Sequence, residues 1–271
     1  MELHEAVGIV TGGATGFGRA FAERILSGGG KVMITDVDVH GLQATGKELQ
    51  RQYGERNVCW DRQDVTERGS FPRAFAYASK YFKTPVNVLV NNAGIAGDMM
   101  FYEPENTKWE AVVDIDLTAL IRGTQFALNE MKRTLNGKEG VIVNLGSMAG
   151  LTATPFGPEY AAAKAGVVGF TRSLYQIKQS HNVRSFCLCP GFAETSMGRQ
   201  ANVEIPEYTN MMGGLLPVEK VVDAFADGLR EPDNAGRVLR IMNKNTAYYR
   251  FPGDKLIFPN SKFVLLLSKK E

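Results

Sequence analysis

Short apolar runs, rich in β-branched residues, recur along this chain and alternate with longer segments of helical pattern. Apolar runs of this length are typical of strands buried on both faces of a parallel sheet. Strands are expected at Val7–Thr11, Lys31–Thr35, Asn57–Trp60, Val86–Val90, Val141–Leu145, Val183–Cys189 and Arg237–Met242. Helices are expected at Arg19–Leu26, His40–Tyr53, Glu67–Phe82, Thr107–Arg133, Ala161–Ser173 and Pro217–Arg230. The alternation predicts an α/β fold, a doubly wound, seven-stranded parallel sheet flanked by helices.

The length and composition fit this architecture. With 271 residues, 44% of them hydrophobic and 22% charged, the chain is long enough for one large α/β domain or two small ones. No internal repeat or linker is visible, so a single domain over residues 1–245 is expected. Two regions fall outside the alternation. The segment 193–216 is expected to form a substrate lid, and the tail 246–271 is expected to pack on the domain or on a dimer partner.

A glycine-rich turn follows the first expected strand and leads into a helix. Gly12, Gly16 and Gly18 let the backbone approach a pyrophosphate, and the helix N-terminus offers free N–H groups and the positive end of a dipole. The spacing is Gly-x-x-x-Gly-x-Gly, which differs from the Gly-x-Gly-x-x-Gly fingerprint. For the glycines alone, an ordinary strand-to-helix turn is as good an interpretation as a dinucleotide site.

Asp36 favours the dinucleotide site. It ends the second strand 18 residues after Gly18, near the ~20 expected for a carboxylate that binds the adenosine ribose. Such a carboxylate repels a 2′-phosphate, and Asp38 adds to the repulsion, so NAD rather than NADP is the expected cofactor. The alternative role for Asp36 is that of a helix N-cap or turn residue, which is common for Asp at a strand end.

The segment from Ser147 to Lys164 carries the expected chemistry. Ser147 follows a strand, at the sheet edge where open α/β sheets bind ligands, and Tyr160 and Lys164 lie about one turn apart on one helix face. A neighbouring ammonium lowers the pKa of a tyrosine from its ordinary value near ~10, so Tyr160 can serve as a base. Tyrosine and lysine at this spacing also occur by chance, so an exposed pair on an amphipathic helix is the alternative.

Several motifs occur together in a fixed order: Thr11-Gly12-x-x-x-Gly16-x-Gly18, Asp64, Asn91-Asn92-Ala93-Gly94, Ser147, Tyr160-x-x-x-Lys164 and Pro190-Gly191. With these motifs the chain resembles the short-chain dehydrogenase/reductase family over residues 5 to about 245. The resemblance implies a single-domain Rossmann fold. Segments around Arg19, Phe170 and Phe192 are similar to 15-hydroxyprostaglandin dehydrogenase-like members. Where those members carry an active-site glutamine before the tyrosine, this chain has Gly157.

The resemblance also implies roles for individual residues. Asp64 and Val65 would contact the adenine, Lys164 the nicotinamide ribose, and Thr195 the nicotinamide end. The alternative role for Asn91 to Gly94 is to shape the turn after a strand, and the alternative role for Pro190-Gly191 is to end a strand. The full expected cofactor-binding set is Gly12, Thr15, Gly16, Phe17, Gly18, Asp36, Asp64, Val65, Asn91, Ala93, Gly94, Tyr160, Lys164, Pro190, Gly191 and Thr195. The expected catalytic set is Ser147, Tyr160, Lys164 and Asp116.

Asp116 departs from the family pattern. The family commonly has Asn at this position, where its backbone carbonyl helps to hold a water that links the lysine to solvent. A backbone role survives the change to Asp116, but a carboxylate in a buried helix has a free-energy cost and perturbs the charge of Lys164.

The expected activity is NAD-dependent oxidation of a secondary alcohol to a ketone by hydride transfer, with Tyr160 as the base and Ser147 holding the substrate oxygen. The alternatives are an NADH-dependent carbonyl reductase in biosynthesis and a non-catalytic dinucleotide-binding protein on the same fold. A lipophilic substrate is expected from the apolar residues of the lid; the alternative is that these residues only pack the lid onto the domain. They are Met197, Ile205, Tyr208, Met211, Met212, Leu215 and Leu216, with 148–156 and 96–101 as further lining segments.

The net charge and the number of cysteines limit which partners and which cellular location are expected. The net charge of +2 with no basic block gives no reason to expect nucleic acid, and no stretch is apolar and long enough for a membrane span. Three cysteines, without a signal peptide, favour free thiols and a cytoplasmic location, and the scattered histidines predict no metal site. The resemblance implies a homodimer or homotetramer, built on the long helix and the helix that carries Tyr160.

Overall fold

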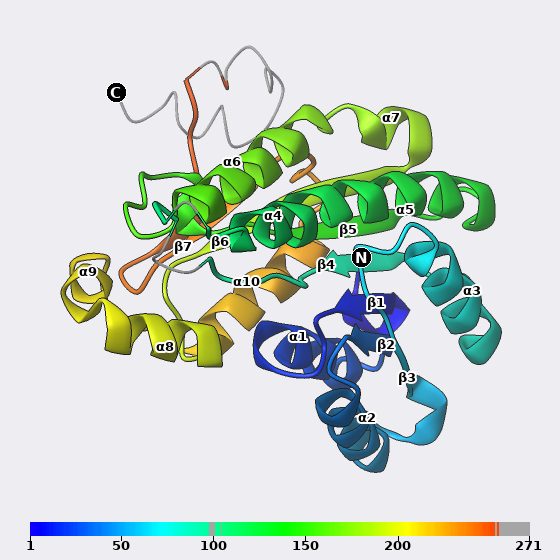
Figure 1. Ribbon diagram of the computed structural model, residues 1–271. Coiled ribbons are helices and arrows are strands. Elements are labelled where there is room, and N and C mark those ends of the chain that lie inside the picture. The colour runs from blue at the N-terminus through cyan, green and yellow to red at the C-terminus, as the bar shows by residue number, and fades with distance from the viewer. Residues whose placement is uncertain (98–100, 104, 253, 255–271) are drawn as a thin grey trace.

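The computed structural model of the chain describes residues 1–97, 101–103, 105–252 and 254, and within them the strands form a sheet in the order β3-β2-β1-β4-β5-β6-β7-β8 (Figure 1). The strands are β1 Val7–Thr11, β2 Lys31–Asp36, β3 Val58–Arg62, β4 Val88–Asn91, β5 Gly140–Leu145, β6 Val183–Pro190, β7 Val238–Ile241 and β8 Thr246–Tyr248. The α-helices are α1 Gly16–Ser27, α2 Val39–Tyr53, α3 Ser70–Phe82, α4 Lys108–Val113, α5 Leu120–Thr134, α6 Pro158–Ser173, α7 Ile177–His181, α8 Ser196–Glu204, α9 Pro206–Met211 and α10 Val218–Arg230. Short turns of other helical type are η1 Leu3–Glu5, η2 Glu55–Asn57, η3 Asp114–Ala119 and η4 Met148–Gly150.

The predicted parallel α/β sheet is confirmed, with one strand more than the seven expected. β1 to β7 pair in parallel, whereas β8 runs antiparallel to β7. Met242 donates its backbone N–H to the carbonyl oxygen of Asn245 at 2.9 Å, which closes the tight turn between these two strands. β8 begins at Thr246, the first residue of the expected tail, and its three residues are too few to show a strand period. Residues 247–252 and 254 of the tail are also described. Residue 253 and residues 255–271, which include the apolar run at 263–267, lie outside the described residues.

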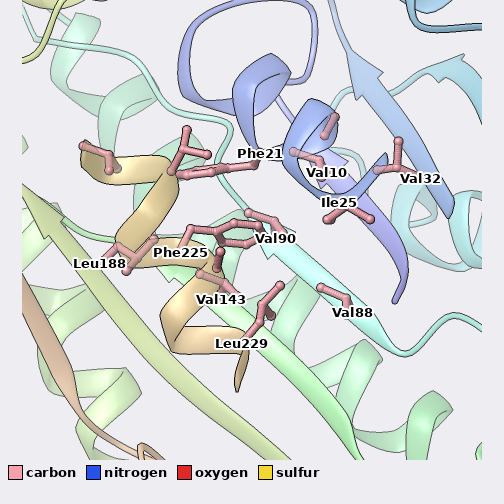
Figure 2. Packing of buried hydrophobic residues seen from close by; sticks show 14 of the residues in the cluster. Val10, Phe21, Ile25, Val32, Val88, Val90, Val143, Leu188, Phe225 and Leu229 are labelled. Atoms are coloured by element: carbon pink, nitrogen blue, oxygen red, sulfur yellow. The ribbon is translucent and has the colours of Figure 1, made fainter. Parts of the chain in front are cut away.

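Helices α1, α2 and α10 cover one face of the sheet. Their apolar residues and those of the central strands form one buried cluster. Figure 2 shows Phe21 of α1 and Phe225 of α10 at its centre, with Val90 and Val143 from the strands beside them. The two phenyl rings lie 4.6 Å apart between centroids. The contact holds α1, and with it the turn before α1, in a fixed place over the strands.

Helices α3, α5 and α6 cover the opposite face. Phe71, Phe75 and Ala78 of α3 are spaced by four and three residues, lie on one helix face and are buried in one cluster with Leu89 and Ile142 of the sheet. A separate buried cluster lies between α5, α6 and β6. The alternation of strand residues between the two clusters is what a parallel sheet covered on both faces requires.

The expected long helix from Thr107 to Arg133 is divided in the structure. α4 and α5 are joined by η3, a π-helical turn over Asp114–Ala119. The expected lid 193–216 contains two helices, α8 and α9, and a parallel bridge between Ala193 and Leu216 closes its base. Among the described residues, no helix has the length and apolar character needed to cross a membrane.

Candidate active site

The predicted site residues gather where the parallel strands end at their carboxyl termini. β1 lies between β2 and β4. The connection that follows β2 and the connection that follows β4 run to opposite faces of the sheet. Ligands of open α/β sheets bind at such a switch point. Gly12 follows β1, Asp36 ends β2, Asn91 ends β4 and Ser147 follows β5. The fold therefore brings the expected cofactor and catalytic residues to one edge.

The glycine turn has the geometry of a phosphate-binding turn. Gly12 and Gly16 have φ angles of 65° and 56°, a region that favours glycine. A side chain at Gly18 would collide with the carbonyl oxygen of Gly12. Thr15, the N-cap of α1, makes no side-chain cap hydrogen bond, so the first N–H groups of α1 are available to an anion. Phe17 is turned toward the core and stacks on Phe21 at 5.9 Å between ring centroids.

Two residues that sequence reasoning did not place in the site brace this turn. The side-chain amide of Asn92 donates to the carbonyl oxygens of Thr11 and Gly12 at 2.8 and 3.1 Å. The hydroxyl of Thr11 accepts from the backbone N–H groups of Asn92 and Ala93, both at 3.0 Å. These bonds tie the end of β1 to the end of β4. The sequence signal that could have identified Asn92 is its place as the second asparagine of the Asn-Asn-Ala-Gly motif.

Asp36 lies beside the glycine turn, with both carboxylate oxygens directed at backbone N–H groups. One oxygen accepts from Ala14 and the other from Asp38, each at 3.1 Å. Asp38 instead caps α2, accepting from the backbone of Gly41 at 3.1 Å. Asp36 thus serves as a turn residue and also keeps lone pairs free for ribose hydroxyls, because each carboxylate oxygen accepts more than one hydrogen bond.

Three of the expected adenosine contacts are already engaged within the protein. Asp64 accepts from the backbone and hydroxyl of Thr66 at 2.9 and 2.6 Å, and these bonds lower its pKa. Val65 packs in the core against α3. The side-chain amide of Asn91 donates to Asn144 and Thr124 at 2.9 and 3.0 Å. A cofactor at this edge would therefore meet the backbone of Val65 and Asn91 rather than their side chains.

Ser147 and Tyr160 are presented by η4 and α6. Ser147 is the N-cap of η4, where its hydroxyl accepts from the backbone of Ala149 at 3.1 Å. η4 packs closely on α6, since a side chain at Gly150 would lie 2.5 Å from the carbonyl oxygen of Lys164. The Ser147 hydroxyl is near enough to Tyr160 to lower the pKa of its phenol by hydrogen bonding. Ser147 and Tyr160 therefore lie close to each other.

Lys164 is almost completely enclosed. Its ammonium donates to the carbonyl oxygen of Leu145 at 3.0 Å and forms an ion pair with a carboxylate oxygen of Asp116 at 2.9 Å. Its nitrogen lies 5.4 Å from the centroid of the Tyr160 ring. Burial lowers the pKa of Lys164, but Asp116 and Tyr160 raise it, and the net result is a pKa above the ordinary value. The amine is therefore a stable cation.

Tyr160 departs from the expected direction of its pKa. Burial is the largest cause and raises the pKa, Lys164 lowers it, and Asp116 raises it again, so the net pKa lies above that of a free tyrosine. The neighbouring ammonium alone predicts a lower pKa for Tyr160. Burial of the phenol and the Asp116 carboxylate act in the opposite direction and outweigh it.

The nicotinamide end of the expected site is built from β6 and the start of the lid. Gly191 follows the last residue of β6 and donates its N–H to the carbonyl oxygen of Ile241 at 2.9 Å. Thr195 is the N-cap of α8, and its side chain is 3.7 Å from where a Cβ of Gly16 would lie. Gly94 faces the Asp116 carboxylate: a Cβ atom added at Gly94 would lie 3.0 Å from one of the carboxylate oxygens. Thr195 thus lies beside the glycine turn, whereas Gly191 packs against Leu216 and Met242.

The lid contacts the segment between η4 and α6 through aromatic rings. Tyr208 of α9 lies 5.4 Å from Phe156 and 6.1 Å from Phe192 between ring centroids. Its hydroxyl donates to the carbonyl oxygen of Ala153 at 3.2 Å. Leu216 is buried at the base of the lid, whereas Met211 is 70% exposed. Of the expected lining segment 96–101, residues 98–100 lie outside the described residues.

Comparisons with known proteins agree with this geometry. Residues 6–205 match the short chain dehydrogenase family. The chain is 33% identical to the Homo sapiens 15-hydroxyprostaglandin dehydrogenase (NAD(+)) over 238 residues, 84% of this chain and 86% of that protein. It is also 32% identical to the Aquifex aeolicus 3-oxoacyl-(acyl-carrier-protein) reductase FabG over 207 residues, 76% of this chain and 82% of that protein. The predicted likeness to 15-hydroxyprostaglandin dehydrogenase-like members is confirmed, and the chain belongs to the short chain dehydrogenase family.

Proposed function

We propose that the protein is an NAD-dependent oxidoreductase that oxidises a secondary alcohol of a lipophilic small molecule to a ketone, with Tyr160 as the base. The observation that carries this proposal is the gathering of Ser147, Tyr160 and Lys164 beside the glycine turn at one sheet edge. A proton acceptor, a hydroxyl for the substrate oxygen and a phosphate-binding turn are the parts that a hydride-transfer site requires.

Each of the three side chains has a separate role in the proposed reaction. Ser147 donates a hydrogen bond to the substrate oxygen, and Tyr160 takes the hydroxyl proton. Lys164 has three N–H donors; one binds Leu145, one faces Asp116, and the third is left for the nicotinamide ribose. When bound, NAD supplies the nicotinamide that accepts the hydride, so the products are the ketone, NADH and a proton.

NAD as the cofactor is supported by the acidic end of β2. The Asp36 carboxylate is held by two backbone N–H groups next to the glycine turn, where the ribose of a dinucleotide lies in this fold. A 2′-phosphate would meet this carboxylate and the nearby Asp38. The names of the 15-hydroxyprostaglandin dehydrogenase relatives include NAD(+), which agrees with this choice.

A lipophilic substrate is supported by the aromatic contact between the lid and the segment before α6. The ring of Tyr208 contacts the rings of Phe156 and Phe192, which places apolar surface between the lid and the segment before α6. Of the lid's other predicted lining residues, Leu216 is buried and serves packing, while Met197 remains 41% exposed. We propose that residues 193–216 act as a substrate lid within one domain of residues 1–245.

A carbonyl reductase that uses NADH is the second candidate. Two observations favour it: the likeness to a 3-oxoacyl-(acyl-carrier-protein) reductase, and a Tyr160 pKa raised above that of free tyrosine. The same side chains serve both directions, because the phenol that forms when Tyr160 takes a proton is the acid that the reverse reaction needs.

The protein is further proposed to be a cytoplasmic homodimer or homotetramer. Cys59, Cys187 and Cys189 are buried free thiols, which fits a reducing compartment. On α6, Ala165 and Gly169 are exposed, and a Cβ at Gly169 would have no atom within 4 Å, so a partner helix can approach closely.

Initial rates with a panel of secondary alcohols and ketones, followed by NADH absorbance, test the proposal. Oxidation of apolar alcohols with NAD, and weak activity with NADP, is the expected result. Reduction of ketones without measurable alcohol oxidation at any pH would favour the second candidate. Tight NADH binding without turnover of any substrate in the panel would favour a non-catalytic dinucleotide-binding protein.

A further inference from the structure

Asp116 has an arrangement that the proposed chemistry does not by itself require. It lies on η3, the π-helical turn that divides α4 from α5, and turns of this kind often occur at functional sites. Its side chain is completely buried. One carboxylate oxygen accepts from the backbone of Ile95 at 2.8 Å, and the other forms the ion pair with Lys164 at 2.9 Å. The first oxygen is hydrogen-bonded, whereas the second is engaged by the ion pair alone and makes no hydrogen bond.

The ion pair changes what Lys164 can do for Tyr160. The carboxylate is 2.9 Å from the ammonium, whereas the centroid of the phenol ring is 5.4 Å from it. The positive charge is thus opposed by a nearer, buried negative charge. In a buried site, where charges are poorly screened, an ion-paired ammonium stabilises a neighbouring phenolate much less than an uncompensated ammonium does.

We infer that Asp116 is a positioning residue that engages the Lys164 ammonium and so keeps Tyr160 a neutral phenol at neutral pH. The inference rests on the proposed function for its meaning in catalysis. A neutral phenol can give its proton to a carbonyl oxygen, whereas alcohol oxidation needs the phenolate. Oxidation should therefore rise toward alkaline pH, while the acid form needed for carbonyl reduction is present at neutral pH.

The charged and titratable groups around the pair agree with this assignment. Tyr160 is faced by Lys164 from its own helix, by Asp116 from η3 and by Cys189 from β6, with the Ser147 hydroxyl after β5. Lys164 also faces Cys187 on β6. Burial raises the pKa of Cys189 well above its ordinary value, so this thiol remains neutral. Asp116 is the one carboxylate among these groups, and it forms an ion pair with Lys164.

The test is a titration of tyrosinate absorbance on the cofactor-free protein. Each spectrum is corrected by subtracting that of the matching Tyr160→Phe variant, which removes the signal of the other tyrosines. The wild-type Tyr160 should ionise near or above the ordinary tyrosine range, at about pH 10 or higher. Asp116→Asn should lower that midpoint by about one pH unit or more, because loss of the carboxylate favours the phenolate. Asp116→Glu should keep the wild-type midpoint.

Several outcomes would overturn the inference. A wild-type Tyr160 midpoint clearly below the ordinary tyrosine value of ~10 would do so, even if Asp116→Asn does not fold. So would an unchanged or raised midpoint in a folded Asp116→Asn protein, since that would mean that Lys164 loses its proton instead. Asp114→Asn, on the same turn but exposed, is the matched control and should leave the midpoint unchanged. If the wild type unfolds before Tyr160 ionises, the absence of tyrosinate up to that pH is the expected result. The titration needs no substrate, so its outcome is independent of whether any alcohol is turned over.

Discussion

Individual residues in this site are defined by what surrounds them more than by their own chemistry. Tyr160 has an ammonium nearby, but burial and Asp116 oppose its effect. Lys164 is a stable cation because a carboxylate shares its enclosure. Asp36 and Asp38 are two residues apart, yet one is held beside the glycine turn and the other caps α2. Substitutions at these positions therefore have separable effects.

Tyr160→Phe should abolish turnover and leave NAD binding nearly intact. Phenylalanine keeps the ring but loses the hydroxyl that accepts and returns the proton, a loss that typically costs ~10²–10⁴-fold in rate. Steady-state rates and NADH fluorescence titrations would measure the two effects. Near-normal turnover by Tyr160→Phe on a good substrate would refute the assignment of the base.

Lys164→Ala is the contrasting variant. It should reduce both cofactor affinity and rate, and it should also destabilise the protein by about 3–5 kcal/mol because it leaves the Asp116 carboxylate buried without a counter-ion. Urea unfolding followed by circular dichroism would give the stability change. Equal stability of wild type and Lys164→Ala would mean that the ion pair contributes nothing net to the folded state.

Asp36→Ala should narrow the preference for NAD over NADP. The change removes both a hydrogen-bond acceptor for the ribose and a charge that repels a 2′-phosphate. The ratio of NAD affinity to NADP affinity should therefore fall about tenfold or more. Asp38→Ala is the matched control: it should lower stability by about 1 kcal/mol through loss of the α2 cap and change the preference less. Dissociation constants for NADH and NADPH measure both. A wild type that binds the two equally would contradict the cofactor assignment.

At the scale of elements, the sequence predicted what is periodic and missed what depends on tertiary contacts. The apolar runs identified all seven parallel strands, and α1, α2, α3, α6 and α10 were located to within a few residues. The π-turn at η3 was not predicted, because the run 107–133 has a continuous helical pattern and the ion pair of Asp116 with Lys164 joins residues far apart in the sequence. α8 and α9 were not predicted because their short, mixed sequences give no clear helical period. β8 has only three residues.

A buried polar network joins β4, β5 and β6 beneath the site. The amide of Asn144 donates to Thr171 and Ser185 at 2.9 and 3.3 Å, and its oxygen accepts from Asn91 at 2.9 Å. These side chains are completely or almost completely buried. The network therefore fixes the relative positions of the strand ends that carry Asn91 and Ser147, provided that each polar group keeps its partner.

Asn144→Ala should break this network. Each buried polar group that is left without a partner costs about 1–3 kcal/mol, so the loss in unfolding free energy should exceed that of an ordinary surface substitution several-fold. Asn129→Ala on α5, an exposed asparagine that binds Gln125 within the same helix, is the control and should cost less than about 0.5 kcal/mol. Chemical denaturation gives both values. Similar costs for the two variants would show that the network adds no cooperativity.

At the scale of the whole molecule, the two covering layers differ in what they leave exposed. α1 and α10 bury their apolar stripes against the sheet, and their Phe21 and Phe225 rings are fully enclosed. The layer that contains α4, α5 and α6 instead exposes Trp109 by 42% and Ile121 by 37%. Exposed aromatic and branched side chains beside a stripe of small residues are typical of a surface that packs against another protein.

The last prediction is that α4, α5 and α6 form the face through which the chain associates with itself. Light scattering should give a mass of two or four times 29.7 kDa at micromolar concentration. Ala165→Arg places a long cation near Gly169 on the exposed face of α6, where it would block the close approach of a partner helix, and should yield monomers. Ala44→Arg introduces the same side chain on the exposed face of α2, in the other layer, and should leave the mass unchanged. A monomeric wild type would refute the oligomer itself.

An Ala165→Arg protein that keeps the oligomeric mass would show that the interface lies on a different surface. Loss of the oligomer in both variants would indicate a general solubility effect of the added charge and not an interface on α4, α5 and α6.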